Sequence, residues 1–460
     1  MITIPLLEAC VAVGGKTNKE ISPIDYVSDV TQNSKEVKEG TLFVALKGNK
    51  VDGHSFIKEA EKSGAVAAVV EYDVPDIKIP QFIVPSTVEA LGHLGRIWCG
   101  RLNIPVIAVT GSVGKTSTKE LIAYTLSDKY KTHKSRKNYN NQLGVPIELL
   151  RIERHHECSV VEFGMRNMNQ INYLSRIARP AYSVITNIGM SHIEMLKSRE
   201  NIARAKSEIL EGMDFNGVLI LNRDDEFYDF IAKKAHCKVI TFGKHKDAQV
   251  KISDIQLSEK AHPTFKLNDT SITMHNCVGR YHAYNAAVAF TVAMQMGLKK
   301  DDAAKRISAF KTPEKRGVVS FLKNGALVLD STYSAAPDSI KASLDTLSEL
   351  TGRGKRTIAV IGEMVELGKH SEEAHKYIGK VIAKLKPGID FLFTVGDYAQ
   401  FIGKESGNRN WKHFKNSESV SKHLIKMLEN EDIVLLQGSN NINLERVTDD
   451  LEKTFGVRGK

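Results

Sequence analysis

Short runs of buried-type hydrophobic residues alternate with amphipathic, helix-like segments along most of the chain. Between residues 40 and 71 the order is a strand-like GTLFVALKG, a helical DGHSFIKEAEKSG and a strand-like AVAAVVE. From residue 105 to residue 243 further strand-like runs follow, namely PVIAV, SVVEFG, YSVITNIG, GVLILN and KVITFG. This alternation with helices predicts an α/β fold with mostly parallel, doubly wound sheets.

The pattern changes at residues 245–278, where QVKISDIQL and SITMHNCV predict antiparallel strands before a helical YHAYNAAVAFTVAMQMG. After residues 311–313 the alternation resumes with ALVLD, RTIAVIGEM, DFLFTVGD and DIVLLQGS, and helices are predicted from Pro337 and Ser371. Ligands of such open sheets bind beyond the carboxyl ends of the strands. We therefore expect one edge of this second sheet to carry the polar residues Asp330, Glu363, Asp397 and 437–440.

These changes of pattern divide the 460 residues into three predicted domains, 1–103, 104–312 and 313–460. The first is a small α/β domain, the second contains the longest parallel sheet, and the third is Rossmann-like. A hydrophobic fraction of 42% and a charged fraction of 26% are typical of a folded globular protein.

Composition excludes several classes of protein. Lysine and arginine number 64 against 54 acidic residues, but they form no arginine-rich block, so the charge balance fits phosphate-bearing small molecules at least as well as a nucleic acid. From this balance together with the motifs described below, we expect no nucleic-acid partner. The five cysteines form no CxxC pair, which argues against a disulfide framework or a zinc site. No apolar run approaches the ~20 residues of a membrane span and the N-terminus has no basic region, so we expect no membrane insertion and a cytoplasmic location.

The strongest chemical signal is the segment TGSVGKTS, which directly follows the strand-like PVIAV and precedes a helix. Glycines in such a loop let backbone N–H groups surround phosphate oxygens, the lysine neutralises the β/γ-phosphates, and the hydroxyl after it can bind Mg²⁺. The first glycine of the full P-loop pattern is replaced by Val109. ATP or GTP is expected to contact Thr110, Gly111, Ser112, Val113, Gly114, Lys115, Thr116 and Ser117.

Two residues stand where a P-loop sheet would place metal ligands. Glu162 ends SVVEFG, and His192 lies in the loop after YSVITNIG. A lone Glu at a strand end is usually solvated, and a lone His is more often structural. The prediction that both residues are metal ligands therefore depends on the sheet edge that they are expected to share with Lys115. Mg²⁺ prefers oxygen ligands and keeps waters, so His192 would be an uncommon ligand or one that acts through water.

A series of motifs in this order resembles the signatures of the Mur ligase family. They are TGSVGKTSTKE, NYNNQLGVP (138–146), VVEFGM (160–165), TNIGMSHIE (186–194), ARAKSEI (203–209), GRYHAYNA (279–286), LDSTYSAAP (329–337) and GEMVELG (362–368). The segment TQNSKEVKEGTLFVALKGNKVDGHSF is similar to the members that add the third residue or the terminal dipeptide of the peptidoglycan precursor.

The resemblance implies a monomeric, three-domain ligase that uses ATP and Mg²⁺. Its first domain would hold UDP-N-acetylmuramoyl-tripeptide, its second would bind ATP, and its third would bring D-alanyl-D-alanine. ATP would phosphorylate the tripeptide carboxylate, and the dipeptide amine would attack the acyl phosphate to form the amide. Such an enzyme contributes to peptidoglycan synthesis and so to cell shape and division.

Roles for individual residues are also implied by the resemblance. Lys206 matches the family lysine that becomes carbamylated, although without the resemblance it would be read as a solvated helix lysine. The implied catalytic residues are Lys115, His192, Lys206 and Arg316, and the implied metal ligands are Thr116, Glu162, His192 and the Lys206 carbamate. Nucleotide contacts are implied for Asn285, Arg316 and Asp330, UDP contacts for Ser34 and His54, and sugar-peptide contacts for Asn140 and Asn141.

The chain departs from the family pattern mainly on the ATP and acceptor side. The expected HN reads Tyr281-His282, DDxYNANP reads DSTYSAAP with Ser331, Ser334 and Ala336, and KGSR reads QGSN from Gln437 to Asn440. The last change removes two fixed cations, and neither Gln nor Asn replaces an ionic contact. Three readings stay open: an active ligase of the same reaction, a ligase with another amino component or acyl substrate, and a weakly catalytic homologue that acts by binding.

Overall fold

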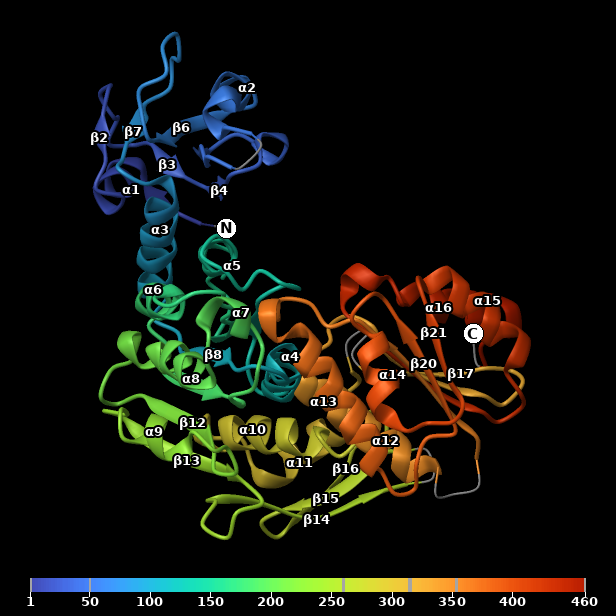
Figure 1. The fold of residues 1–460 in the computed structure, drawn as a ribbon. Helices are drawn as coiled ribbons and strands as arrows, with labels where there is room; N and C mark the ends of the chain where they lie inside the picture. The colour runs from blue at the N-terminus through green and yellow to red at the C-terminus, as the bar shows by residue number, and fades with distance from the viewer. Residues whose placement is uncertain (1, 49–50, 259–260, 313–316, 352–354, 459–460) are drawn as a thin grey trace.

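The computed structural model describes residues 2–48, 51–258, 261–312, 317–351 and 355–458. Within these residues three α/β domains are arranged as in Figure 1: a small N-terminal domain at the top, a central domain below it, and a C-terminal domain beside the central one. The α/β class and the three-domain organisation predicted from the sequence are confirmed.

The N-terminal domain is built on a sheet of order β2-β7-β6-β5-β4, in which β4 to β7 run parallel and β2 is antiparallel to β7. A short ladder of β1 and β3 lies beside it. The strands are β1 (Ile4–Pro5), β2 (Lys16–Thr17), β3 (Tyr26–Val27), β4 (Asp29–Thr31), β5 (Thr41–Val44), β6 (Ala65–Val70) and β7 (Gln81–Ile83). The helices are α1 (Leu6–Ala12), η1 (Ser34–Glu36), η2 (Gly53–Phe56), α2 (Ile57–Lys62) and α3 (Thr87–Leu102).

The central sheet has the order β16-β15-β14-β13-β12-β11-β8-β10-β9 and is parallel from β9 to β14. Its strands are β8 (Val106–Thr110), β9 (Thr132–Lys134), β10 (Cys158–Glu162), β11 (Tyr182–Ile185), β12 (Val218–Asn222), β13 (Lys238–Gly243), β14 (Val250–Leu257), β15 (Pro263–Leu267) and β16 (Thr270–Thr273). The predicted antiparallel strands of 245–278 are confirmed for β14, β15 and β16, and β14 joins the parallel part through β13.

Helices cover both faces of the central sheet, because alternate residues of its strands face opposite sides. Val106 and Ala108 of β8 belong to one buried cluster, and Ile107 and Val109 belong to the cluster on the other face, with α4 and α10. The helices are α4 (Lys115–Leu126), α5 (Gly144–Leu150), α6 (Gln170–Ala178), α7 (Ile193–Leu196), α8 (Arg199–Ser207), η3 (Glu208–Gly212), α9 (Tyr228–Ala232), α10 (His282–Gln295) and α11 (Lys300–Ala309).

The C-terminal domain has the sheet order β17-β18-β22-β19-β20-β21, parallel except for β17. Its strands are β17 (Val318–Phe321), β18 (Leu327–Ser331), β19 (Thr357–Gly362), β20 (Phe391–Val395), β21 (Trp411–Phe414) and β22 (Ile433–Gln437). Its helices are α12 (Pro337–Thr351), η4 (Gly368–His370), α13 (Ser371–Lys384), α14 (Gln400–Ser406), α15 (Ser417–Met427), η5 (Asn440–Ile442) and α16 (Glu445–Phe455). The register places the ends of β18, β22, β19 and β20 at one edge, as predicted for Asp330, Glu363, Asp397 and 437–440.

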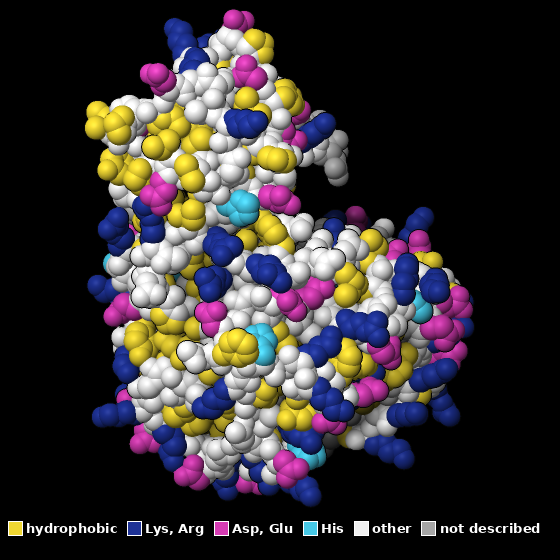
Figure 2. Space-filling view, turned by 90° about the vertical axis from the view of Figure 1, so that its left-hand side faces the viewer, with side chains coloured by type: hydrophobic (Ala, Val, Ile, Leu, Met, Phe, Trp, Pro, Cys, Tyr) yellow, Lys and Arg dark blue, Asp and Glu magenta, His cyan; other side chains and the backbone are white. Residues whose placement is uncertain are grey.

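On the face drawn in Figure 2, basic and acidic side chains are intermixed and form no continuous basic surface. Among the described residues no helix is both long enough and apolar enough to cross a membrane.

Candidate active site

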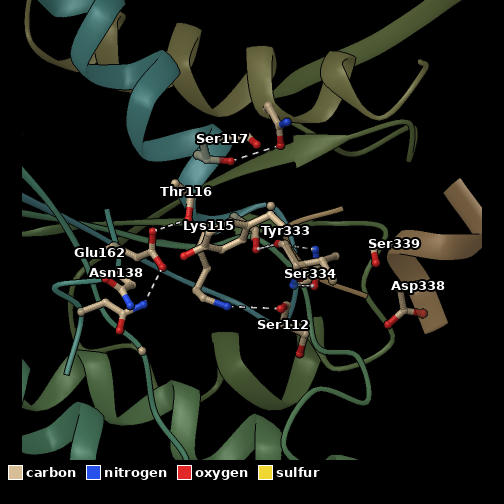
Figure 3. A pocket seen from close by; sticks show the side chains of 18 of the residues that line it. Ser112, Lys115, Thr116, Ser117, Asn138, Glu162, Tyr333, Ser334, Asp338 and Ser339 are labelled. Atoms are coloured by element: carbon tan, nitrogen blue, oxygen red, sulfur yellow. Dashed lines mark hydrogen bonds between the residues drawn. The ribbon is translucent and has the colours of Figure 1, made fainter. Parts of the chain in front are cut away.

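A cavity of about 900 Å³ lies where the loop after β8, the helix α10 and the start of α12 meet. The central domain supplies most of its wall, and the C-terminal domain closes one side (Figure 3). The lining residues are 112–118, 138, 140–143, 162, 164–166, 170, 186–187, 192, 222, 242, 281, 284–285, 288, 331, 333–334, 338–339, 342–343 and 437. The cavity therefore combines the P-loop with segments more than 200 residues away in the sequence.

The loop from Thr110 to Lys115 has the backbone shape that its glycines permit. Gly111 has φ 148°, and a Cβ there would lie 1.8 Å from the Thr186 hydroxyl oxygen, so a larger residue does not fit. Gly114 has φ 82° and caps the N-terminus of α4. The N-terminus of α4, with the positive end of its helix dipole, therefore lies at this loop, which is the arrangement that an anion site uses.

Lys115 begins α4 and reaches back across this loop. Its Nζ donates to the carbonyl oxygens of Gly111 at 2.8 Å and Ser112 at 3.2 Å. Figure 3 shows Lys115 extending toward Ser112. Phosphate oxygens are stronger acceptors than carbonyl oxygens for an ammonium group, because the hydrogen bond is then charged on both sides. The side chain is in place to turn from the loop to a bound phosphate.

Glu162, at the end of β10, is 3% exposed and faces the P-loop. Its carboxylate accepts one hydrogen bond from the Thr116 hydroxyl at 2.6 Å and another from Asn140 Nδ2 at 2.8 Å. Figure 3 shows Thr116 and Glu162 pointing toward each other. Thr116 and Asn140, which were predicted from the sequence as site residues together with Glu162, therefore both contact its carboxylate.

Magnesium fits these donors in chemical type. A hydroxyl and a carboxylate are the hard oxygen ligands that Mg²⁺ prefers, and Mg²⁺ commonly completes its shell with water and substrate phosphates. In the described part of the chain no group of three His, Cys, Asp or Glu residues is arranged to hold a metal. The oxygens of Thr116 and Glu162 would therefore hold Mg²⁺ together with phosphate and water.

Lys206 lies in α8 and is 1% exposed, so the prediction of a solvated lysine that its sequence context alone would give is wrong. Burial, and then the positive charge of Lys115, hold the pKa of its amine well below the usual value. No ion pair joins it to a carboxylate among the described residues. It is not one of the residues that line the cavity.

His192 lines the cavity in the loop that precedes α7. Its Nδ1 lies 2.7 Å from Oε2 of Glu366, which belongs to the C-terminal domain. The close contact with His192, and then the charge of Arg166, hold the pKa of the Glu366 carboxyl below its usual range. The sequence did not single out Glu366, because only the packing of two domains brings it to His192.

The structure places the predicted nucleotide-contact residues in different surroundings. Asn285 lines the cavity, and its Oδ1 accepts a hydrogen bond from the Thr118 hydroxyl at 3.1 Å. Asp330 is not among the lining residues: its carboxylate accepts from the backbone and hydroxyl of Thr332 and from the Thr448 hydroxyl. Arg316 lies outside the described residues.

Asn140 and Asn141 both line the cavity, whereas Ser34 and His54 lie in the N-terminal domain and do not. His54 is buried, with Nε2 accepting from the Glu71 backbone and Nδ1 2.6 Å from Asp52 Oδ1. These bonds fix the ring within its own domain.

The sequence did not predict that Thr186 and Asn187 hold the P-loop in place. Asn187 exchanges hydrogen bonds with both backbone groups of Val113, and the Thr186 hydroxyl donates to the same Val113 oxygen at 2.7 Å. The sequence pattern predicts one strand-like run, YSVITNIG, and so includes TNIG in the strand. β11 ends at Ile185, which frees these side chains to hold the loop.

The departures from the family pattern concentrate at this cavity. Tyr281, Ser331, Ser334 and Gln437 line it. His282 is fully buried beside it, and Asn440 is exposed.

Three family models match consecutive parts of the chain: the Mur ligase family, catalytic domain at residues 27–109, the Mur ligase middle domain at 109–293, and the Mur ligase, glutamate ligase domain at 318–440. A UDP-N-acetylmuramoyl-tripeptide--D-alanyl-D-alanine ligase of Bacillus subtilis is 33% identical over 436 residues, which are 92% of this chain and 93% of that protein. The chain belongs to the Mur ligase family. As a Mur ligase, it is an ATP-dependent ligase.

Solved structures agree with this assignment. A crystal structure of MurF from Acinetobacter baumannii superposes with a TM-score of 0.90 at 28% identity, covering 98% of this chain and 99% of that one. MurF ligase from Thermotoga maritima in complex with ADP gives a TM-score of 0.84 at 29% identity, covering 93% and 97%. The predicted family and ATP dependence are confirmed.

Proposed function

We propose that this Mur ligase joins D-alanyl-D-alanine to UDP-N-acetylmuramoyl-tripeptide in peptidoglycan precursor synthesis, through an acyl phosphate. The observation that carries the proposal is the single cavity that joins the P-loop and Glu162 to a wall from the C-terminal domain. Relatives that carry this activity in their names match the chain over almost their whole length. In this proposal residues 1–103 hold the UDP-sugar, 104–312 hold ATP, and 313–460 bring the dipeptide.

The proposed reaction has two balanced steps. The tripeptide carboxylate takes the γ-phosphoryl group of ATP, which leaves ADP and an acyl phosphate. The dipeptide amine then attacks the acyl carbon, the C–O bond to phosphate breaks, and the amide, inorganic phosphate and a proton are released. Lys115 and the N-terminus of α4 would stabilise the negative charge of the transferring phosphoryl group.

The test is ADP release by the purified protein with ATP and Mg²⁺, in the presence of both substrates and with each omitted in turn. Turnover that needs both UDP-N-acetylmuramoyl-tripeptide and D-alanyl-D-alanine is the expected result. ATP binding without any turnover would contradict the proposal and favour a homologue that acts by binding.

A ligase with a different amino component is the second candidate, and a specific observation favours it. Gln437, which lines the cavity, and Asn440 stand where the family pattern has lysine and arginine. Two neutral amides bind a dipeptide carboxylate less strongly than two cations do. ADP release that requires the tripeptide substrate and responds to another amine, but not to D-alanyl-D-alanine, would select this candidate.

We further propose that Lys206 is carbamylated. Its neutral amine would add to CO₂, forming an N–C bond and releasing one proton, and so convert a buried cation into a carboxylate that can ligate Mg²⁺. Its burial, its lowered amine pKa and the nearby charge of Lys115 support this reaction, because an unprotonated amine is the reactive form and the product anion would face a cation.

The carbamate predicts a specific rescue. Lys206→Ala should lose most activity, and a short carboxylic acid added to the assay should restore part of it by occupying the space of the carbamate. A ¹³C signal from labelled CO₂ should be present in the wild type and absent in the variant. Full activity of Lys206→Ala, or no ¹³C signal in the wild type, would contradict carbamylation.

A further inference from the structure

The loop after β19 reaches from the C-terminal domain to the central domain through one carboxylate. Glu366 places Oε1 2.9 Å from Arg166 Nη2 and Oε2 2.7 Å from His192 Nδ1. Arg166 follows β10 and His192 follows β11, and both line the cavity. One side chain of the C-terminal domain therefore contacts two separate loops of the ATP site.

The backbone at both ends of the contact is held in an uncommon conformation. Glu366 has φ 61° and His192 has φ 65°, in the left-handed region that non-glycine residues rarely adopt. Such conformations persist only where the surroundings impose them, and they concentrate at functional sites. Nearby, Gly368 lies against Glu194 of α7: a Cβ on Gly368 would be 2.5 Å from the Cγ of Glu194. The loop is therefore packed closely on α7.

The ring of His192 has two distinct nitrogens, and Glu366 lies at only one of them. The two atoms are close but not aligned as a hydrogen bond. Through its charge, a carboxylate this close to Nδ1 still favours a proton on that nitrogen, so Nε2 keeps a lone pair for a metal, its water or a phosphate-bound group. Carboxylates of this kind commonly orient histidines at metal sites from the outer shell. Here the orienting carboxylate comes from a different domain than the histidine.

We propose that Glu366 is a positioning residue that orients His192, so that docking of the C-terminal domain completes the ATP site of the central domain. This inference rests on the proposed function for its kinetic consequence. The orientation of His192 itself is a property of the protein without substrates.

The kinetic test is Glu366→Gln, which keeps the size of the side chain and removes its charge. Its matched control is Glu349→Gln, because Glu349 in α12 pairs with Arg280 of the central domain and so also joins the two domains, without touching His192. We expect Glu366→Gln to lower kcat about tenfold to hundredfold with little change in KM for the UDP-sugar substrate, and Glu349→Gln to stay within about twofold of the wild type, as is usual for an exposed ion pair.

Two further measurements distinguish a positioning role of Glu366 from a general loss of structure in the variant. In protein labelled with ¹⁵N-histidine and free of substrates, at about pH 8 where an ordinary imidazole is neutral, the His192 ring should have its proton on Nδ1 in the wild type and lose that preference in Glu366→Gln. The His192→Gln variant assigns the signal. In a His192→Gln background, Glu366→Gln should have almost no additional effect on kcat.

The proposal is overturned if the His192 signals are the same with Glu and Gln at position 366. It is also overturned if the two carboxylate variants have equal kcat, or if the effects of Glu366→Gln and His192→Gln multiply independently. A protein without ligase turnover would refute the proposed function, whereas the ¹⁵N measurement would still decide the orientation of His192.

Discussion

His282 is a buried histidine whose two ring nitrogens have no hydrogen-bond partner among the described residues. It is the first residue of α10, and its ring packs on Tyr281 with centroids 4.5 Å apart. Burial lowers its pKa to about 3. The folded state thus holds a neutral imidazole, and charging it requires exposure to water.

The low pKa makes His282 a source of acid instability. Because the pKa in the unfolded chain is about 6.5, the unfolded state binds the proton first, and stability falls as the pH drops from about 6.5 toward 3. His282→Leu should therefore raise the free energy of unfolding relative to the wild type by about 1.4 kcal/mol more at pH ~5.5 than at neutral pH. Denaturant unfolding at the two pH values measures this difference.

His375 provides the control, because it is also buried but both of its ring nitrogens are bonded. Nε2 accepts from the Met364 backbone at 3.0 Å, and Nδ1 donates to the Ser371 carbonyl at 2.6 Å. His375→Leu should lower the free energy of unfolding by about 1–3 kcal/mol at neutral pH, because it leaves buried backbone groups unpaired. An equal loss in His282→Leu would contradict the interpretation of His282.

At the scale of elements, the parallel strands and the P-loop were predictable, since both are encoded in contiguous segments. PVIAV followed by TGSVGKT became β8, the loop and α4 with little change in bounds. β17 was missed because its four residues are all half-buried and show no alternation, and β21 was missed because it is a short edge strand. Such strands are defined by their neighbours rather than by their own pattern.

The candidate site was predictable where adjacent parallel strands bring both partners of a contact to one sheet edge, and less so elsewhere. Glu162 ends β10, and Thr116 lies in the first turn of α4, which follows the neighbouring parallel strand β8. The sheet itself therefore brings the two side chains together. Asp330 is the penultimate residue of β18, but its carboxylate accepts a hydrogen bond from the hydroxyl of Thr332, two residues later. The strand pattern does not reveal this local competition. Glu366 becomes visible only once two domains pack.

At the scale of the whole molecule, the N-terminal and central domains share one buried apolar cluster. Leu91 and Leu94 of α3 belong to it together with Ile147 and Leu150 of α5, a helix of the central domain. α3 also approaches α5 closely, since a Cβ on Gly95 would lie 3.2 Å from Pro146. We therefore expect these two domains to unfold together.

Trp98 of α3 tests this connection, because its indole donates to the Ile152 carbonyl of the central domain at 2.7 Å in a buried setting. Trp98→Phe should lower the free energy of unfolding by about 1–3 kcal/mol, since it leaves the Ile152 oxygen without its donor, and the loss of stability should extend to the central domain.

Trp411→Phe is the control. Trp411 donates to the Thr394 hydroxyl, which also pairs with His413, so this variant should lose less stability. Calorimetry with and without ATP and Mg²⁺ identifies the central-domain transition as the one that nucleotide shifts. If Trp98→Phe leaves that transition in place, the two domains unfold independently and the shared cluster does not couple them.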